Sequence, residues 1–144
     1  MPRWMSIRTL ACGLALVVVM AGAGISQARR YVGIHVKGHT FRTGPLAADV
    51  QLRLVCPPRT QASPRLGDFS FCTGRMVITR GGRIVAHGPF SIRTFDSHLE
   101  HFPTTRAGRR VFKPGRRVTV HWRARSHNGL GHYATRSGNV QVIR

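Results

Sequence analysis

Apolar and polar residues alternate along most of the chain beyond its N-terminal quarter, with the period of two that is typical of half-buried β-strands. Turn residues interrupt the alternation every eight to twelve residues or so, and no stretch has the periodicity of a long helix. The core-facing positions of the expected strands are Val32, Ile34 and Val36; Val50, Leu52, Leu54 and Cys56; Cys72, Gly74, Met76 and Ile78; Phe90 and Ile92; Val118, Val120, Trp122 and Ala124; and Val140 and Val142. The pattern predicts an all-β domain of antiparallel strands, arranged as a β-sandwich or as a sheet closed on itself.

Two turns can be assigned from glycine and proline. Gly81-Gly82 predicts a tight hairpin between the strand that begins at Cys72 and a partner strand near 83–87. Pro114-Gly115 has the residues preferred at the centre of a type II turn. The hairpin signal favours antiparallel pairing of the two strands that flank Gly81-Gly82.

The first 28 residues have the three parts of a secretion signal. Arg3 and Arg8 precede the uncharged, mostly apolar stretch 10–25, and Ser26-Gln27-Ala28 places small residues where a signal peptidase cuts. As an uncleaved anchor, those 16 residues would form a helix of about 24 Å, short of a hydrocarbon core of about 30 Å. We therefore expect a signal helix at 1–28, a single domain at 29–144, no stable membrane span after cleavage, and a secreted or cell-envelope location.

Cleavage would remove Cys12 and leave Cys56 and Cys72. Both remaining cysteines share a strand face with core residues, and export to an oxidising compartment favours a disulfide between them. A pair of free or metal-binding thiols is the alternative. The sequence predicts the disulfide, because no further cysteine or Cys-x-x-Cys spacing supports a metal site.

Charge is the strongest compositional signal. Without Arg3 and Arg8 the chain keeps 21 basic residues against four acidic ones, a net charge of +17. Nearly all the basic residues are arginines, whose planar guanidinium suits phosphate, sulfate and carboxylate groups. Such a surface is expected to attract polyanions.

The densest run of arginines lies between residues 106 and 125. It predicts a polyanion-binding patch, with generic solvation of a basic surface as the alternative. Aromatic residues are too few to indicate stacking on bases, so anionic envelope polymers or polysaccharide are the expected partners and nucleic acid is not. The residues of this predicted patch are Arg106, Arg109, Arg110, Arg116, Arg117, Arg123 and Arg125.

Several short motifs together resemble a known class of secreted domain. The motifs are Cys56, Cys72-Thr73-Gly74, Gly88-Pro89-Phe90-Ser91-Ile92, Pro114-Gly115-Arg116-Arg117-Val118-Thr119-Val120 and Gly138-Asn139-Val140-Gln141-Val142. Over residues 48–143 they resemble the disulfide-bearing Ig-like or fibronectin-like modules of proteins secreted by high-GC Gram-positive bacteria. The resemblance implies an Ig-like antiparallel β-sandwich of about seven strands. It also implies a role as a spacer, an adhesion module or a carbohydrate-contacting module, although many such modules have no known role.

Candidate chemistry outside the arginines is weak. The histidine pairs His35 and His39, His98 and His101, and His127 and His132 could bind a metal, but carboxylate partners are scarce. Asp96-Ser97-His98 has the residue types of a hydrolase triad, yet adjacent residues cannot align as a triad requires, and local turn chemistry explains the run. We expect no catalytic residues, no bound metal and no cofactor.

The sequence thus favours a secreted, strongly basic, non-enzymatic β-sandwich module that associates with anionic cell-envelope material or with a protein partner. The alternative is a small secreted hydrolase or a histidine-based metal-binding protein.

Overall fold

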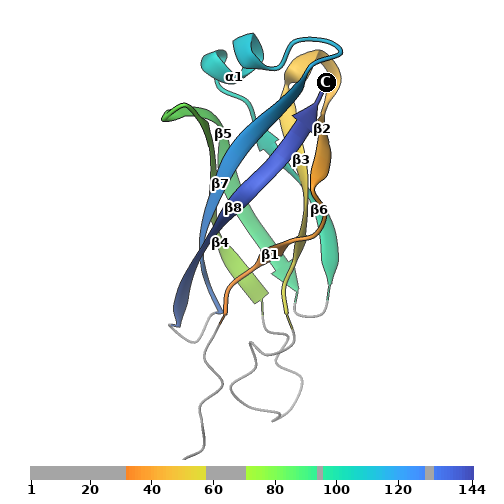
Figure 1. The fold of residues 1–144 in the computed structure, drawn as a ribbon. Coiled ribbons are helices and arrows are strands. Elements are labelled where there is room, and N and C mark those ends of the chain that lie inside the picture. The colour runs from red at the N-terminus through yellow and green to blue at the C-terminus, as the bar shows by residue number, and fades with distance from the viewer. Residues whose placement is uncertain (1–31, 58–70, 94–95, 129–131) are drawn as a thin grey trace, which may run out of the picture.

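The computed structural model describes residues 32–57, 71–93, 96–128 and 132–144, so the predicted signal helix at 1–28 lies outside the described residues. Within these ranges nearly all regular structure is β, which confirms the predicted all-β class (Figure 1). The elements are β1 (His35–Val36), β2 (Thr40–Thr43), the 3-10 turn η1 (Pro45–Ala47), β3 (Asp49–Val55), β4 (Phe71–Arg80), β5 (Arg83–Arg93), β6 (Ser97–Pro103), α1 (Arg106–Val111), β7 (Arg117–His127) and β8 (Tyr133–Ile143).

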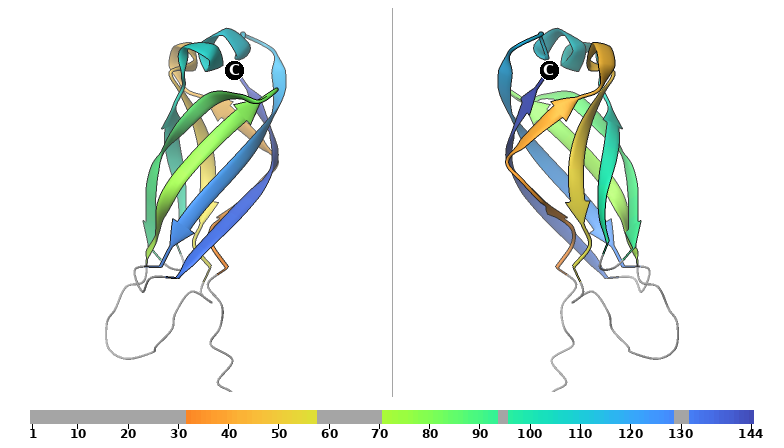
Figure 2. Two further views of the ribbon diagram at one scale, coloured as in Figure 1. Left: turned by 90° about the vertical axis from the view of Figure 1, so that its left-hand side faces the viewer. Right: turned by 90° about the vertical axis from the view of Figure 1, so that its right-hand side faces the viewer.

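All eight described strands belong to one hydrogen-bonded sheet. Its order is β1-β3-β2-β8-β7-β4-β5, and β6 pairs with β3 outside this path. The sheet curls, so that β8, β7, β4 and β5 lie on one side of the molecule and β3 and β6 on the other (Figures 1 and 2). β2 connects the two sides, because it pairs antiparallel with β3 and parallel with β8. A bridge between Ala86 and Thr104 brings β5 close to the end of β6.

The core fills the space that the curled sheet encloses. In β7 every second residue is buried, from Val118 through Val120, Trp122 and Ala124 to Ser126. The predicted core positions of β3 and β4 are also buried, apart from the half-buried Gly74. Burying one Val, Leu or Ile side chain contributes about 1.5–3 kcal/mol, so this alternation is the main source of stability.

Both predicted turns are confirmed. Gly81 and Gly82 have φ angles of 53° and 76°, in the left-handed region that a tight hairpin turn requires, and Arg80 pairs with Arg83 across the turn. Gly115 has a φ of 70°, and the Arg116 amide donates to the Lys113 carbonyl at 3.2 Å. This geometry is that of the expected type II turn.

Several elements differ from the sequence prediction: β2, β6 and α1 were not predicted, and β5 and β1 have other bounds than expected. β5 continues from Arg83 to Arg93 without a break at Pro89. Proline has no backbone amide hydrogen to donate, and the sheet tolerates it because β5 is the last strand of its path. β6 was not predicted, because Phe102 is its one buried side chain and six exposed or half-buried residues give no alternation. The expected strand at 32–37 is reduced to the two residues of β1, which begins two residues after Gly33, whose φ of 78° breaks the extended conformation.

The predicted disulfide is present between Cys56, just after β3, and Cys72 in β4. Both cysteines have no exposed surface, and their Cα atoms are 5.7 Å apart. The bond joins the two sides of the curled sheet, because β3 lies on one side and β4 on the other.

α1 is fixed against a β-bulge in β5. The pairing of β4 with β5 shifts register between Ile78 and Thr79, which leaves Val85 as an extra, buried residue. The Val85 carbonyl accepts a hydrogen bond from the Thr105 amide at 2.9 Å, and the Thr105 hydroxyl donates to the Ile84 carbonyl at 2.8 Å. Thr105 is also the N-cap of α1 and accepts from the Gly108 amide at 3.1 Å. These bonds attach α1 to one end of the sheet, near η1 (Figure 2).

Removal of the disulfide is expected to lower the free energy of unfolding. The bond closes a loop with a sequence separation of 16, which should stabilise the fold by about 3 kcal/mol through the unfolded state. Urea denaturation of a Cys56→Ala, Cys72→Ala variant should show this loss, and a reducing agent should destabilise the wild type equally while leaving the variant unaffected. Equal stability of oxidised wild type and variant would contradict the expectation.

Gly108→Ala is expected to destabilise the protein although alanine favours helix over glycine by about 1 kcal/mol. A Cβ at this position would lie 2.0 Å from the Val85 carbonyl oxygen, so α1 would have to move off the bulge. We expect a net loss of about 1–3 kcal/mol and faster hydrogen exchange at the Thr105 amide. Ala107→Gly is the control, since it loses helix propensity without a clash and should leave that amide protected.

Candidate anion-binding surface

The seven arginines of the predicted patch are all exposed, but they fall into three groups. Arg106, Arg109 and Arg110 lie on α1, and Arg116 and Arg117 lie at the turn before β7 and at its first residue. The third group, Arg123 and Arg125, points outward from the middle of β7. Arg117 and Arg125 are separated by about 26 Å along the strand. The patch is therefore a long stripe over one end and one side of the molecule.

The stripe gains a residue from the neighbouring strand. Arg75 in β4 lies directly opposite Arg125 in β7, and Arg123 pairs with Val77 one outward position further along. Side chains directly opposite in an antiparallel pair have Cβ atoms about 5 Å apart, and diagonal neighbours are about 7–8 Å apart. We call Arg75, Arg123 and Arg125 the arginine face.

The acidic residues that the structure describes are segregated from the arginine face. The three acids in the described ranges are Asp49 at the start of β3, Asp96 before β6 and Glu100 in β6. Asp49 accepts from the Gly44 amide at 2.8 Å and contacts His101 at 2.6 Å, and Glu100 lies 3.5 Å from His98. Within the described part of the chain, no carboxylate is in salt-bridge distance of the arginine face.

An aromatic side chain lies beside the arginine face. The guanidinium of Arg125 lies 5.3 Å from the centre of the Tyr133 ring, within the range of a cation–π interaction. Tyr133 is 63% exposed, and its ring is 5.5 Å from that of His127 at an angle of 51°. The contact holds Arg125 near the surface of the sheet without neutralising its charge.

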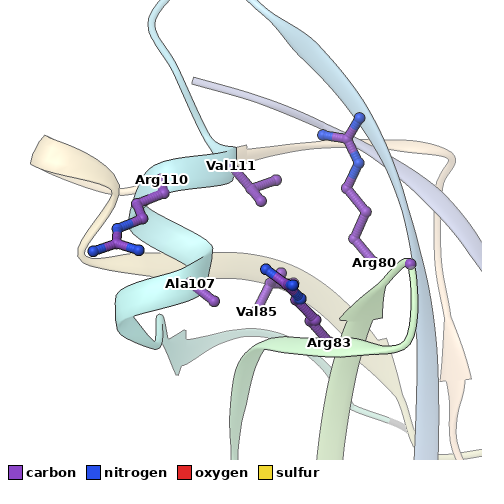
Figure 3. Close-up of a pocket in the computed structure, with 7 residues that line it drawn as sticks. Arg80, Arg83, Val85, Ala107, Arg110 and Val111 are labelled. Carbon is purple, nitrogen blue, oxygen red and sulfur yellow. The ribbon is translucent and has the colours of Figure 1, made fainter.

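A pocket of about 350 Å³ lies where the β4–β5 hairpin meets α1 (Figure 3). We call it the end pocket. Three of its lining residues are arginines, and Val85, Ala107 and Val111 supply the apolar part. Arg110 was predicted from the sequence as a binding residue, but Arg80 and Arg83 were not, because they lie near α1 only through the docking of that helix on β5. The lining residues are Arg80, Gly81, Arg83, Val85, Ala107, Arg110 and Val111.

The predicted histidine pairs do not form metal sites in the described ranges, where no three His, Cys, Asp or Glu side chains cluster closely enough to hold an ion. His98 and His101 pair with Leu54 and Gln51 of β3, which face opposite sides of the sheet, so the two imidazoles point apart. His132 contacts the Asn128 side chain at 3.3 Å. Burial, and next the charge of Arg136, lower the pKa of His35.

The Asp96-Ser97-His98 run is divided between a turn and a strand. The Asp96 amide donates to the Arg93 carbonyl at 3.1 Å, and Ser97 begins β6. Successive side chains of a strand point to opposite faces, so Ser97 and His98 diverge. The local geometry agrees with turn chemistry at Asp96.

Arg75→Thr is expected to raise stability at low salt. The substitution removes a like-charge pair with Arg125 and introduces a residue with good β propensity, for a gain of about 0.2–1 kcal/mol. In 1 M salt, where the screening length is about 3 Å, most of the electrostatic gain should vanish. Thermal denaturation at two salt concentrations measures both effects. The control is Arg42→Thr, which removes the same charge, but Arg42 pairs with Gln51 and Ile143, so this variant should show a smaller salt-dependent gain.

Comparisons of the chain with protein-family models, with curated proteins and with solved structures found no match. In the described ranges, no helix has the length and apolar character needed to cross a membrane.

Proposed function

We propose that this protein is a secreted, non-enzymatic, Ig-like module that associates through its arginine face with anionic polymers of the cell envelope. The three-part N-terminal signal supports export, and the buried disulfide suits an oxidising compartment. The single observation that carries the binding role is the pairing of Arg75 with Arg125 on a surface with no nearby carboxylate in the described residues.

The strand pairing supports the Ig-like assignment. If β1 and β2 are taken as one divided first strand, the second strand (β3) pairs with the fifth (β6), as in Ig domains. The third, sixth and seventh strands (β4, β7 and β8) pair side by side, also as in Ig domains. Three departures distinguish this chain: β2 links both sides by hydrogen bonds, the fourth strand (β5) pairs with the third (β4) and not with the fifth, and the disulfide joins the second and third strands.

The arginine face has the physical properties that a polyanion requires. Like charges on opposed strands destabilise the isolated protein, and an anionic chain laid along β7 would relieve that repulsion. Binding would release counterions from the polymer, which makes affinity fall steeply with salt. Guanidinium groups can also form paired hydrogen bonds with phosphate, sulfate or carboxylate oxygens. The stripe from Arg117 to Arg125 is about 26 Å long, enough to contact several repeats of a polymer.

Chromatography on immobilised heparin and on purified anionic cell-wall polymer tests the proposal. The variant Arg123→Gln, Arg125→Gln should elute at clearly lower salt than the wild type. The slope of log affinity against log salt should fall by about two, one for each lost contact.

The matched control is Lys37→Gln, Arg53→Gln. These two exposed cations are also neighbours, since the Lys37 amide donates to the Arg53 carbonyl at 2.8 Å, but they lie on the β3 side of the molecule. The control loses the same net charge. Equal elution shifts for the two variants would show that only diffuse charge acts, and would refute a dedicated face.

A further inference from the structure

The end pocket concentrates positive charge in a way that the fold does not require. Arg80 and Arg83 are directly opposite in the last pair of the β4–β5 hairpin. Arg80 lies on the same face of β4 as the buried Met76 and Ile78, and Arg83 is its partner across the hairpin. Both arginines lie beyond the end of the core and are exposed. Figure 3 shows the Arg83 side chain extending from the hairpin toward α1, whereas the Arg80 side chain extends upward in the view, with its guanidinium apart from that of Arg83.

No carboxylate of the described residues balances this charge. The residues that line the end pocket are three arginines, one glycine and three apolar residues, and none of them takes part in the ion pairs of the described chain. Opposed like charges destabilise a hairpin. Arg80 and Arg83 are both exposed, and a Cβ on either glycine between them would meet no atom within 4 Å, so this end of the hairpin is open to solvent.

The scaffold of the end pocket is rigidly built. Val85 is buried at the bulge, and its carbonyl both accepts from Thr105 and contacts Gly108 of α1 closely. Phe112, the C-cap of α1, is almost fully buried and fixes the other end of the helix. Because the hairpin and α1 are attached through backbone contacts, the positions from which the three arginines extend are set before any ligand arrives, which reduces the entropic cost of binding.

We propose that the end pocket binds the phosphate group of a phosphate ester, with the carbon part of the ester against the half-buried Ala107 and Val111. A phosphate offers at least three strong acceptor oxygens and up to two negative charges, which suits guanidinium groups that come from two different elements. A carboxylate has two oxygens, which a single arginine can satisfy. In Figure 3 the Arg110 guanidinium points away from Arg80, so Arg110 must turn inward and should contribute less than Arg83.

This site is separate from the arginine face and does not depend on it. The end pocket takes one phosphate group, whereas the arginine face contacts a polymer along β7. A free phosphate ester, a polymeric polyol phosphate and a phospholipid headgroup share the chemistry that the pocket recognises. The experiment therefore needs probes that distinguish these three sources.

NMR titration of the ¹⁵N-labelled protein with glycerol 3-phosphate tests the proposal. We expect saturable shifts of the Gly81, Gly82 and Val111 amides, which titration with sodium acetate at equal ionic strength should not reproduce. Arg83→Gln should weaken binding about tenfold, as expected for the loss of charge-assisted hydrogen bonds, and Arg110→Gln should weaken it less. Arg123→Gln, Arg125→Gln should bind glycerol 3-phosphate as the wild type does.

Two outcomes would overturn the proposal. One is acetate binding as tightly as glycerol 3-phosphate, and the other is an equal loss of affinity in Arg83→Gln and in the Arg123, Arg125 variant. An unchanged melting temperature of Arg83→Gln would show that the substitution leaves the hairpin intact. If Arg83→Gln does perturb the hairpin, Arg80→Gln provides a second test of the site.

Polymeric glycerol phosphate and phosphatidylglycerol vesicles identify the source of the phosphate. Competition of either probe with glycerol 3-phosphate at the Gly81 and Gly82 amides supports the site, and binding of the polymer alone, without any binding of the monomer, overturns it. The elution of Arg83→Gln from the anionic polymer column distinguishes failure of the phosphate site from failure of the proposed function. Loss of the end pocket should leave elution governed by the arginine face.

Discussion

Alternation along β7 is the constraint on which the rest of the structure depends. β7 pairs over seven residues with β4 and over its whole length with β8, so its register fixes the neighbours on both sides. The same strand places Val118, Val120 and Trp122 in the core and its arginines in solvent. A shift of one residue would reverse both faces at once. The hydrophobic core therefore holds the cationic stripe in position, although no arginine contributes to the core.

The parts of the fold that could be predicted from sequence are those with a local signal. Val50, Leu52 and Leu54 alternate within one strand, and Gly81-Gly82 defines its hairpin without reference to distant residues. β6 and α1 lack such signals: β6 has one buried side chain, and α1 has six residues that are stabilised by contacts to β5. Their formation depends on partners that the sequence does not place beside them.

The candidate surface shows the same division. Outward positions such as Arg123 and Arg125 follow from alternation alone, whereas the pairing of Arg75 with Arg125 follows from the register between two strands separated by about 50 residues. The end pocket could be predicted from the sequence even less. Its three arginines line one pocket because a bulge at Val85 exposes a carbonyl to Thr105 and because Gly108 permits close approach.

The two cationic sites differ in how salt should act on them. The arginine face lies on an open sheet surface, where binding is driven by counterion release and screening is strong. The end pocket adds an apolar wall to its guanidinium groups, and hydrogen bonds to a partly enclosed phosphate are screened less than charges in open solvent. Occupancy of the pocket should therefore persist at salt concentrations that remove a polymer from the face. The difference arises from the docking of α1, because without that helix Arg80 and Arg83 would be a solvated hairpin tip with no wall opposite.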